Sequence, residues 1–223
     1  MQWPFQLRPR SSLWHPDVPS RSGGMSITGY EQVTASNAGR WRASIAISLR
    51  REPAVLAYRA MISQLQGRAG TILVPYFQAY RPRNLNGRKL STCRAASYEG
   101  NLYNFDLSGW GQDDFTFATL EIGAQAGATQ ISLNLVDGEG PRPGHYFGIG
   151  ERLYLVQSVW QVTPDSPTQV RFWPRLREPA TAGTRVLLDR PVCRMRLADD
   201  SSGEANFDLA RFADVTLNFV EAL

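Results

Sequence analysis

Hydrophobic and polar side chains alternate most clearly over residues 40–50. The odd positions are apolar and most of the even ones are arginine or serine, with the apolar set being Trp41, Ala43, Ile45, Ile47 and Leu49. A period of two over this length is typical of an antiparallel strand with one buried face. The preceding stretch, residues 26–36, is predicted to be the hairpin partner of this strand, with a turn at residues 37–39.

The period then changes to that of a helix. Val55, Tyr58, Ile62 and Leu65 recur at helical spacing after Pro53, and Gly67 and Gly70 follow them. Proline is well tolerated in a first helical turn, and glycine is favoured just beyond a helix end. The pattern therefore predicts one helix of about 14 residues. A strand over residues 71–77 follows it, and then an irregular segment, residues 78–112, of a length that is usually functional or packed by a partner.

The block of residues 123–190 has the pattern of a module of its own. Its short apolar segments, each bounded by Pro- or Gly-containing turns, lie at residues 131–135, 152–159, 170–173 and 185–188. About four or five short strands with regular turn signals predict a small β-barrel. Alternation resumes on either side of a polar loop, at residues 193–197 and 215–219.

A last strand of this quality needs a sheet to join, and the sheet predicted near the N-terminus is the obvious one. We therefore expect a mainly β protein with one flanking helix and an inserted barrel. The predicted boundaries are an N-terminal arm over 1–24, a sheet domain over 25–122 with 191–223, and the inserted barrel over 123–190. Two domains in series remain the alternative.

The N-terminal arm and the first strand supply the candidate subunit-interface residues. Trp3, Phe5 and Trp14 lie in a segment rich in proline, arginine and serine, and such aromatic side chains gain most when they dock on their own domain or on a neighbour. Arg40, Arg42 and Arg50 alternate with the apolar positions, and the planar guanidinium group suits ion pairs with acidic neighbours.

Charge narrows the choice of partners. The net charge is +4, and Lys89 is the only lysine, so arginine carries the excess. Without a long basic run, a solvent- or subunit-facing surface is favoured over direct nucleic-acid binding. Arg171, Trp173 and Arg175 are the best candidates for stacking bases or sugars on the outer domain. The alternative is that Phe172 or Trp173 fills the barrel core.

Candidate chemistry is sparse. The two cysteines, Cys93 and Cys193, and the two histidines, His15 and His145, are far apart in the sequence and lack the clustering that a metal site needs. The acidic pairs at 113–114 and 199–200 fit solvated loops, and the glycines at 148 and 150 fit a β-turn. We expect no catalytic, metal or cofactor site. No apolar run reaches a membrane span, and the first residues do not resemble a signal peptide, so folding in a cytoplasm is expected.

Several stretches resemble minor tail proteins of long-tailed, siphovirus-like phages. They are Ser22–Val33 (SGGMSITGYEQV), Gly39–Ala43 (GRWRA), Gly67–Gly70 (GRAG), Arg142–Leu155 (RPGHYFGIGERLYL), Val170–Arg177 (VRFWPRLR) and Arg190–Leu197 (RPVCRMRL). The nearest family role is the distal tail protein, the ring between the tail tube and the tip hub.

The resemblance implies a tail-tube-like β-sandwich with one flanking helix, an outer β domain and a ring of six copies. It implies the tail tube protein and the tip hub or baseplate protein as neighbours, with the tape measure protein or side fibres as further candidates. The protein would be made in the host cytoplasm and reside in the virion tail tip. Another minor tail or tube-like subunit, and a carbohydrate- or single-stranded-nucleic-acid-binding β module, remain the alternatives.

Overall fold

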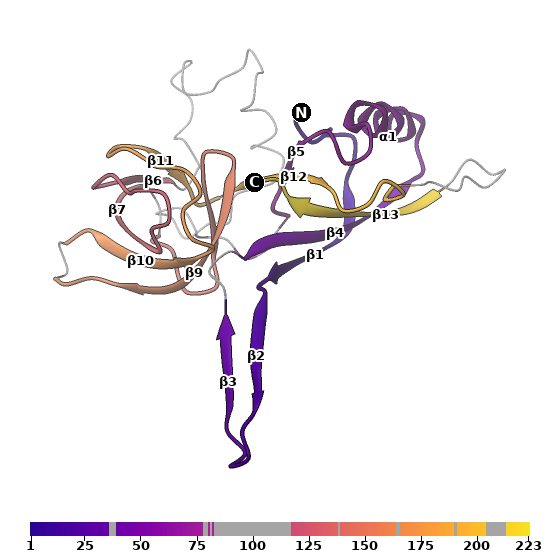
Figure 1. Ribbon diagram of the computed structural model, residues 1–223. Helices are drawn as coiled ribbons and strands as arrows, with labels where there is room; N and C mark the ends of the chain where they lie inside the picture. The colour runs from indigo at the N-terminus through magenta and orange to yellow at the C-terminus, as the bar shows by residue number, and fades with distance from the viewer. Residues whose placement is uncertain are drawn as a thin grey trace, which may run out of the picture. The chain divides into compact units, whose positions relative to one another are not determined.

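The protein is mainly β, as expected, with one helix in the part of the chain that the structure describes (Figure 1). The structure is a computed structural model that describes residues 1–35, 39–77, 80, 82, 117–137, 139–163, 166–189, 191–203 and 213–223. The chain divides into two compact units, Met1–Val74 with Arg194–Leu223, and Pro75–Cys193. Along the chain, the second unit therefore lies between two segments of the first. Its limits, residues 75 and 193, enclose more of the chain than the predicted barrel over 123–190.

The first unit is built on a five-stranded sheet in the order β1-β4-β13-β12-β5. Its strands are β1 (Pro9–Asp17), β4 (Arg40–Leu49), β13 (Ala213–Glu221), β12 (Val192–Leu197) and β5 (Ile72–Pro75). The C-terminal strand β13 pairs with β4 from Ala213 opposite Leu49 to Val220 opposite Arg42. The expectation that this strand joins the N-terminal sheet is therefore confirmed.

The predicted hairpin partner of β4 is wrong. β4 pairs with β1 on one side and β13 on the other, whereas β3 (Glu31–Ala35) pairs with β2 (Ser20–Met25). Residues 1–24, expected to be an arm, thus contribute β1 to the sheet and β2 to a separate hairpin. The strand pattern of β1 is hidden in the sequence because β1 is an edge strand whose side chains are at most half-buried.

Helix α1 (Glu52–Leu65) packs on the apolar face of this sheet, as the sequence predicts. Tyr58, Met61 and Leu65 of the helix are buried together with the apolar positions of β4 and β13. The helix ends at two residues with left-handed backbone, Gln66 and Gly67. Asp200 accepts a hydrogen bond from the Arg68 backbone nitrogen (3.1 Å) just beyond this end, so it does not act only as a solvated loop residue.

The second unit contains a closed six-stranded barrel, which confirms the predicted barrel. Its strands in order around the barrel are β10 (Thr168–Trp173), β7 (Gln130–Asp137), β6 (Phe117–Leu120), β11 (Arg185–Leu187), β8 (Tyr146–Ile149) and β9 (Arg152–Trp160). The core is filled by apolar side chains from all six strands, with Phe147, Tyr154 and Phe172 as its largest members. β6 belongs to this barrel and not to the first unit's sheet, because it pairs with β7 and β11.

Candidate functional site

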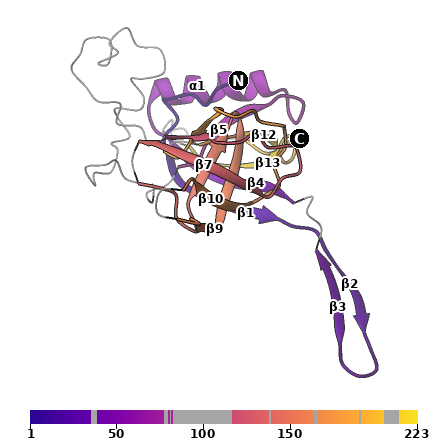
Figure 2. The same ribbon diagram turned by 90° about the vertical axis from the view of Figure 1, so that its left-hand side faces the viewer.

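The β2–β3 hairpin has no buried side in the structure. Every described side chain from Ser20 to Thr34 is exposed, and in the described part of the chain the two strands pair only with each other. The hairpin prolongs the β1–β4 pair as a two-stranded ribbon, with Ser20 opposite Ala35 after Asp17 opposite Arg40 (Figures 1 and 2). An isolated two-stranded hairpin is marginally stable in water. This ribbon is therefore a candidate contact element.

The tip of the hairpin has a defined hydrogen-bond pattern. The Ser26 backbone nitrogen donates to the Tyr30 carbonyl (2.8 Å), and the Gly29 nitrogen donates to the Ser26 carbonyl (2.9 Å). The Tyr30 nitrogen also donates to the Ser26 hydroxyl (3.1 Å). Gly29 has a φ of +84°, a conformation that favours glycine. These bonds fix the backbone on which the tip side chains stand.

Large apolar side chains crowd this tip. Ile27 at its apex is fully exposed, Met25 and Tyr30 near the apex are also exposed, and so is Val33 farther along β3, opposite Ser22. No charged residue lies between Arg21 and Glu31. Exposed apolar patches are a feature of interaction surfaces, so the tip is a candidate contact surface. The sequence does not single out these residues, because it predicts the stretch 26–36 as the strand that pairs with residues 40–50.

A cluster of charged side chains lies where the hairpin meets the sheet. One carboxylate oxygen of Asp17, Oδ2, lies 2.8 Å from Arg42 Nε and 3.3 Å from Arg40 Nε. Hydrogen bonding from Arg42, and then from Arg40, outweighs desolvation and lowers the pKa of Asp17. Arg40 and Arg42, which the sequence offers as candidates for ion pairs with acidic neighbours, both contact an acid of their own chain that the sequence pattern did not reveal. Arg50 lies at the other end of β4 and is exposed.

The aromatic residues of the predicted arm separate into two groups. Trp3 is half-buried: its ring lies edge-on to Phe219 (6.2 Å between centroids), and its Nε1 donates to the Leu7 carbonyl (2.8 Å). Trp14 lies edge-on to Trp41 (6.5 Å). Phe5 alone of the three is mostly exposed. Trp3 and Trp14 therefore pack within their own unit, and Phe5 remains available for a neighbour.

On the barrel, Arg171, Trp173 and Arg175 alternate with buried residues. Phe172 fills the core, whereas Trp173 is half-buried and Arg171 and Arg175 are exposed. Of the two aromatic residues that could occupy the core, it is Phe172 that does so. Arg171 and Trp173 lie on β10 and Arg175 lies just beyond it, and these three residues are called the outer strip below.

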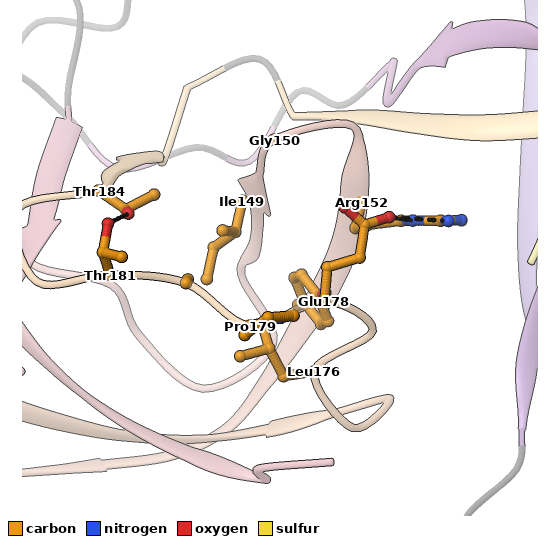
Figure 3. A pocket seen from close by; sticks show the side chains of 10 residues that line it. Ile149, Gly150, Arg152, Leu176, Glu178, Pro179, Thr181 and Thr184 are labelled. Carbon is orange, nitrogen blue, oxygen red and sulfur yellow. Dashed lines mark hydrogen bonds and ion pairs between the residues drawn. The ribbon is translucent and has the colours of Figure 1, made fainter. Parts of the chain in front are cut away.

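A shallow cavity of about 230 Å³ lies on the barrel between β8, β9 and the segment 176–184 (Figure 3). Its charged pair is Arg152, whose side chain is 10% exposed, and Glu178, with Arg152 Nη2 3.1 Å from Glu178 Oε1. The hydroxyls of Thr181 and Thr184 lie 3.3 Å apart at the other end. Most of the remaining lining is apolar, and the guanidinium is neutralised by its partner. The cavity is therefore a poor site for acid–base chemistry, which needs a group held ready to exchange a proton.

The other residues that the sequence offers as candidates for chemistry have local structural roles or are buried. His145 Nδ1 accepts a hydrogen bond from the Arg142 nitrogen (3.1 Å), and burial followed by the charge of Arg142 lowers the pKa of His145. Of the two glycines predicted to form a β-turn, Gly150 lies in the turn between β8 and β9, whereas Gly148 lies within strand β8 and pairs with Leu153. Cys193 is buried, while Cys93 and the acids at 113–114 fall outside the described residues, as does most of the 78–112 segment.

Side chains of the types that bind metal ions are scattered over the described ranges. Over those ranges, no three side chains of His, Cys, Asp or Glu come close enough to hold a metal ion. No helix there is long and apolar enough to cross a membrane. Comparison of the sequence with protein-family models and with curated proteins finds no match.

Proposed function

We propose that the protein is a structural component of a phage tail tip, a distal tail protein whose copies form a ring between the tail tube and the tip hub or baseplate. The observation that carries this proposal is the β2–β3 hairpin, an ordered ribbon with an exposed apolar tip. A single chain gains nothing from displaying Met25, Ile27 and Tyr30 to water, whereas a subunit that inserts them into a neighbour buries them.

The sheet of the first unit offers a second joining device. β1 is an edge strand of nine residues, and its outer edge pairs with no other strand among the described residues. Natural proteins seldom leave a long edge uncovered, because it templates pairing with another chain. Head-to-tail contacts of this kind generate closed rings when the rotation closes. The five-stranded sheet, its helix and its ribbon would then be the tail-tube-like sandwich domain that the resemblance implies.

In this proposal the work is mechanical and not catalytic. A ring of six copies would contact the tail tube protein on one face and the hub on the other, in the virion tail tip. The tape measure protein or side fibres are further partners, and the barrel is the unit available for contacts outside the ring.

The experiment is a comparison of assembly between two matched variants. Ile27→Glu places a charge at the hairpin apex and should abolish rings. It should leave the thermal unfolding temperature unchanged, because the Ile27 side chain is fully exposed and buries no surface within its own chain. Val162→Glu makes the same change at an exposed apolar residue of the second unit and should assemble normally. Negative-stain imaging and mass measurement read the outcome. Normal rings with Ile27→Glu would refute the proposed role of the hairpin.

The barrel strip of Arg171, Trp173 and Arg175 supports a second candidate function, binding of a carbohydrate or of single-stranded nucleic acid. A half-buried ring between two exposed guanidinium groups is the arrangement that stacks on a base or a sugar. Titration with an oligonucleotide at two salt concentrations tests the nucleic-acid form, because phosphate contacts must weaken steeply as salt rises. An affinity that does not change with salt concentration would exclude nucleic-acid binding.

A further inference from the structure

The polar face of the five-stranded sheet carries a band of arginine side chains. The pairing register places His15 opposite Arg42, Arg42 opposite Val220 and Val220 opposite Arg196. Directly paired residues project from the same face of a sheet, so these residues share the face opposite to buried Trp41, Phe219 and Leu197. The next row along contains Asp17 opposite Arg40.

Asp17 fixes the orientation of two of these arginines. Its single oxygen Oδ2 receives the Nε groups of both Arg40 and Arg42, whose side chains are 45% and 58% exposed. Neither arginine donates from its terminal nitrogens to another described residue. Each guanidinium is therefore held at its side and keeps its outer edge, with two terminal nitrogens, for a second partner. That outer edge matches the two oxygens of a carboxylate.

The amount of charge indicates the kind of partner. Asp17 cancels one of the two charges of Arg40 and Arg42, Arg196 on the same face adds one more, and Asp214, opposite Ser48 on that face, removes one. A surplus this small suits one or two carboxylates, whereas proteins that grip duplex DNA neutralise several phosphates. The tryptophans of these strands, Trp14 and Trp41, pack edge-on to each other, and Trp41 is fully buried. They are not displayed as a surface on which single-stranded bases could stack.

We propose that Arg40 and Arg42, held by Asp17, form a docking site for an acidic polypeptide segment of another protein. The segment would place a carboxylate against the outer edge of each guanidinium. Exposed Leu13 and half-buried Ser44, a directly opposed pair one step along the same face, would contact the rest of the segment. The inference does not depend on the tail-tip role, because it rests on the geometry of this face alone.

Binding of a fluorescent oligoglutamate peptide to the full chain, followed by anisotropy at low and at physiological salt, tests the site. The unaltered protein should bind saturably, and Arg42→Gln should weaken the affinity about tenfold, as expected for loss of one charge-assisted bidentate contact. Replacing both Arg40 and Arg42 with glutamine should weaken it further. Arg50→Gln is the matched control, because it removes the same charge at an exposed residue just beyond the far end of β4 and should leave binding unchanged.

Three results would overturn the proposal. They are the absence of saturable binding, an equal loss in Arg50→Gln, and tighter binding of a duplex oligonucleotide that is lost in the same Arg40 and Arg42 variants. The last result would assign the face to nucleic acid instead of protein. Circular dichroism of each variant checks that the sheet remains folded, and the Arg42→Gln change, at an exposed position, should not alter it.

Discussion

Phe172 lies at the centre of the barrel core and is 1% exposed. Its ring meets Phe147 edge-on (5.5 Å, 82°) and Tyr154 edge-on (5.2 Å, 78°). Replacement of a buried Phe by Ala costs about 3–5 kcal/mol, and each aromatic pair of this geometry is worth about 0.5–1.5 kcal/mol beyond its buried area. Because both aromatic pairs are lost with the ring, Phe172→Ala should lie at the upper end of this range, about 4–5 kcal/mol, which approaches the whole stability of a typical domain.

Urea titration measures this loss of stability, and hydrogen exchange shows in which strands it occurs. Exchange protection should fall across strands β6 to β11 and remain in the sheet of the first unit, if the two compact units unfold separately. Trp173→Ala is the control on the adjacent residue, which is only half-buried, and it should cost about 1–2 kcal/mol. An equal or larger effect of Trp173→Ala would refute the assignment of Phe172 to the core and of Trp173 to the outer strip.

Three further predictions concern stability. Gly203→Ala should lower the urea midpoint of the first unit by the equivalent of about 1–3 kcal/mol, because φ is +105° there and an added Cβ would lie 2.8 Å from Ile62 Cδ1; an unchanged midpoint would contradict this close approach. Trp3→Ala should lower the free energy of unfolding by about 2–3 kcal/mol, because the contacts with Leu7 and Phe219 are lost. Phe5→Ala should be nearly neutral, because Phe5 is mostly exposed. Equal urea midpoints for the two variants would show that residues 1–7 do not pack on the sheet. Because the folded-state pKa of His145 is lowered, its contribution to stability should be complete above the ordinary value of 6.5 and decline as pH falls below it, and His145→Gln should remove that step from the pH dependence of the urea midpoint.

The period of apolar residues is sufficient to predict the elements that have one buried and one exposed side. The odd positions of β4, from Trp41 to Leu49, are buried, and the helix spans Glu52–Leu65 where helical spacing placed it. The strand at the C-terminus joins β4, and the strands of the barrel follow the turn signals. In each case one side of the element is buried in a core, so apolar residues recur in the sequence with the period of that element.

The elements that the pattern misplaced lack such a buried side. β1 is an edge strand with a register shift between Pro9 and Ser11, and its side chains do not alternate cleanly between core and solvent. Met25, Ile27 and Val33 belong to a ribbon with both faces in solvent, and sequence alone does not distinguish the strands of such a ribbon from half-buried strands. The Asp17–Arg40–Arg42 cluster joins residues 23 and 25 positions apart, a proximity that only the strand register provides.

The central claim, that copies of this chain close into a ring, is tested most directly by the mass of the purified protein in solution. Native mass spectrometry over a range of concentrations should give a discrete species of six chains of 24.9 kDa each, seen as rings by negative stain. A species that stays at the mass of one chain at every concentration would contradict the account.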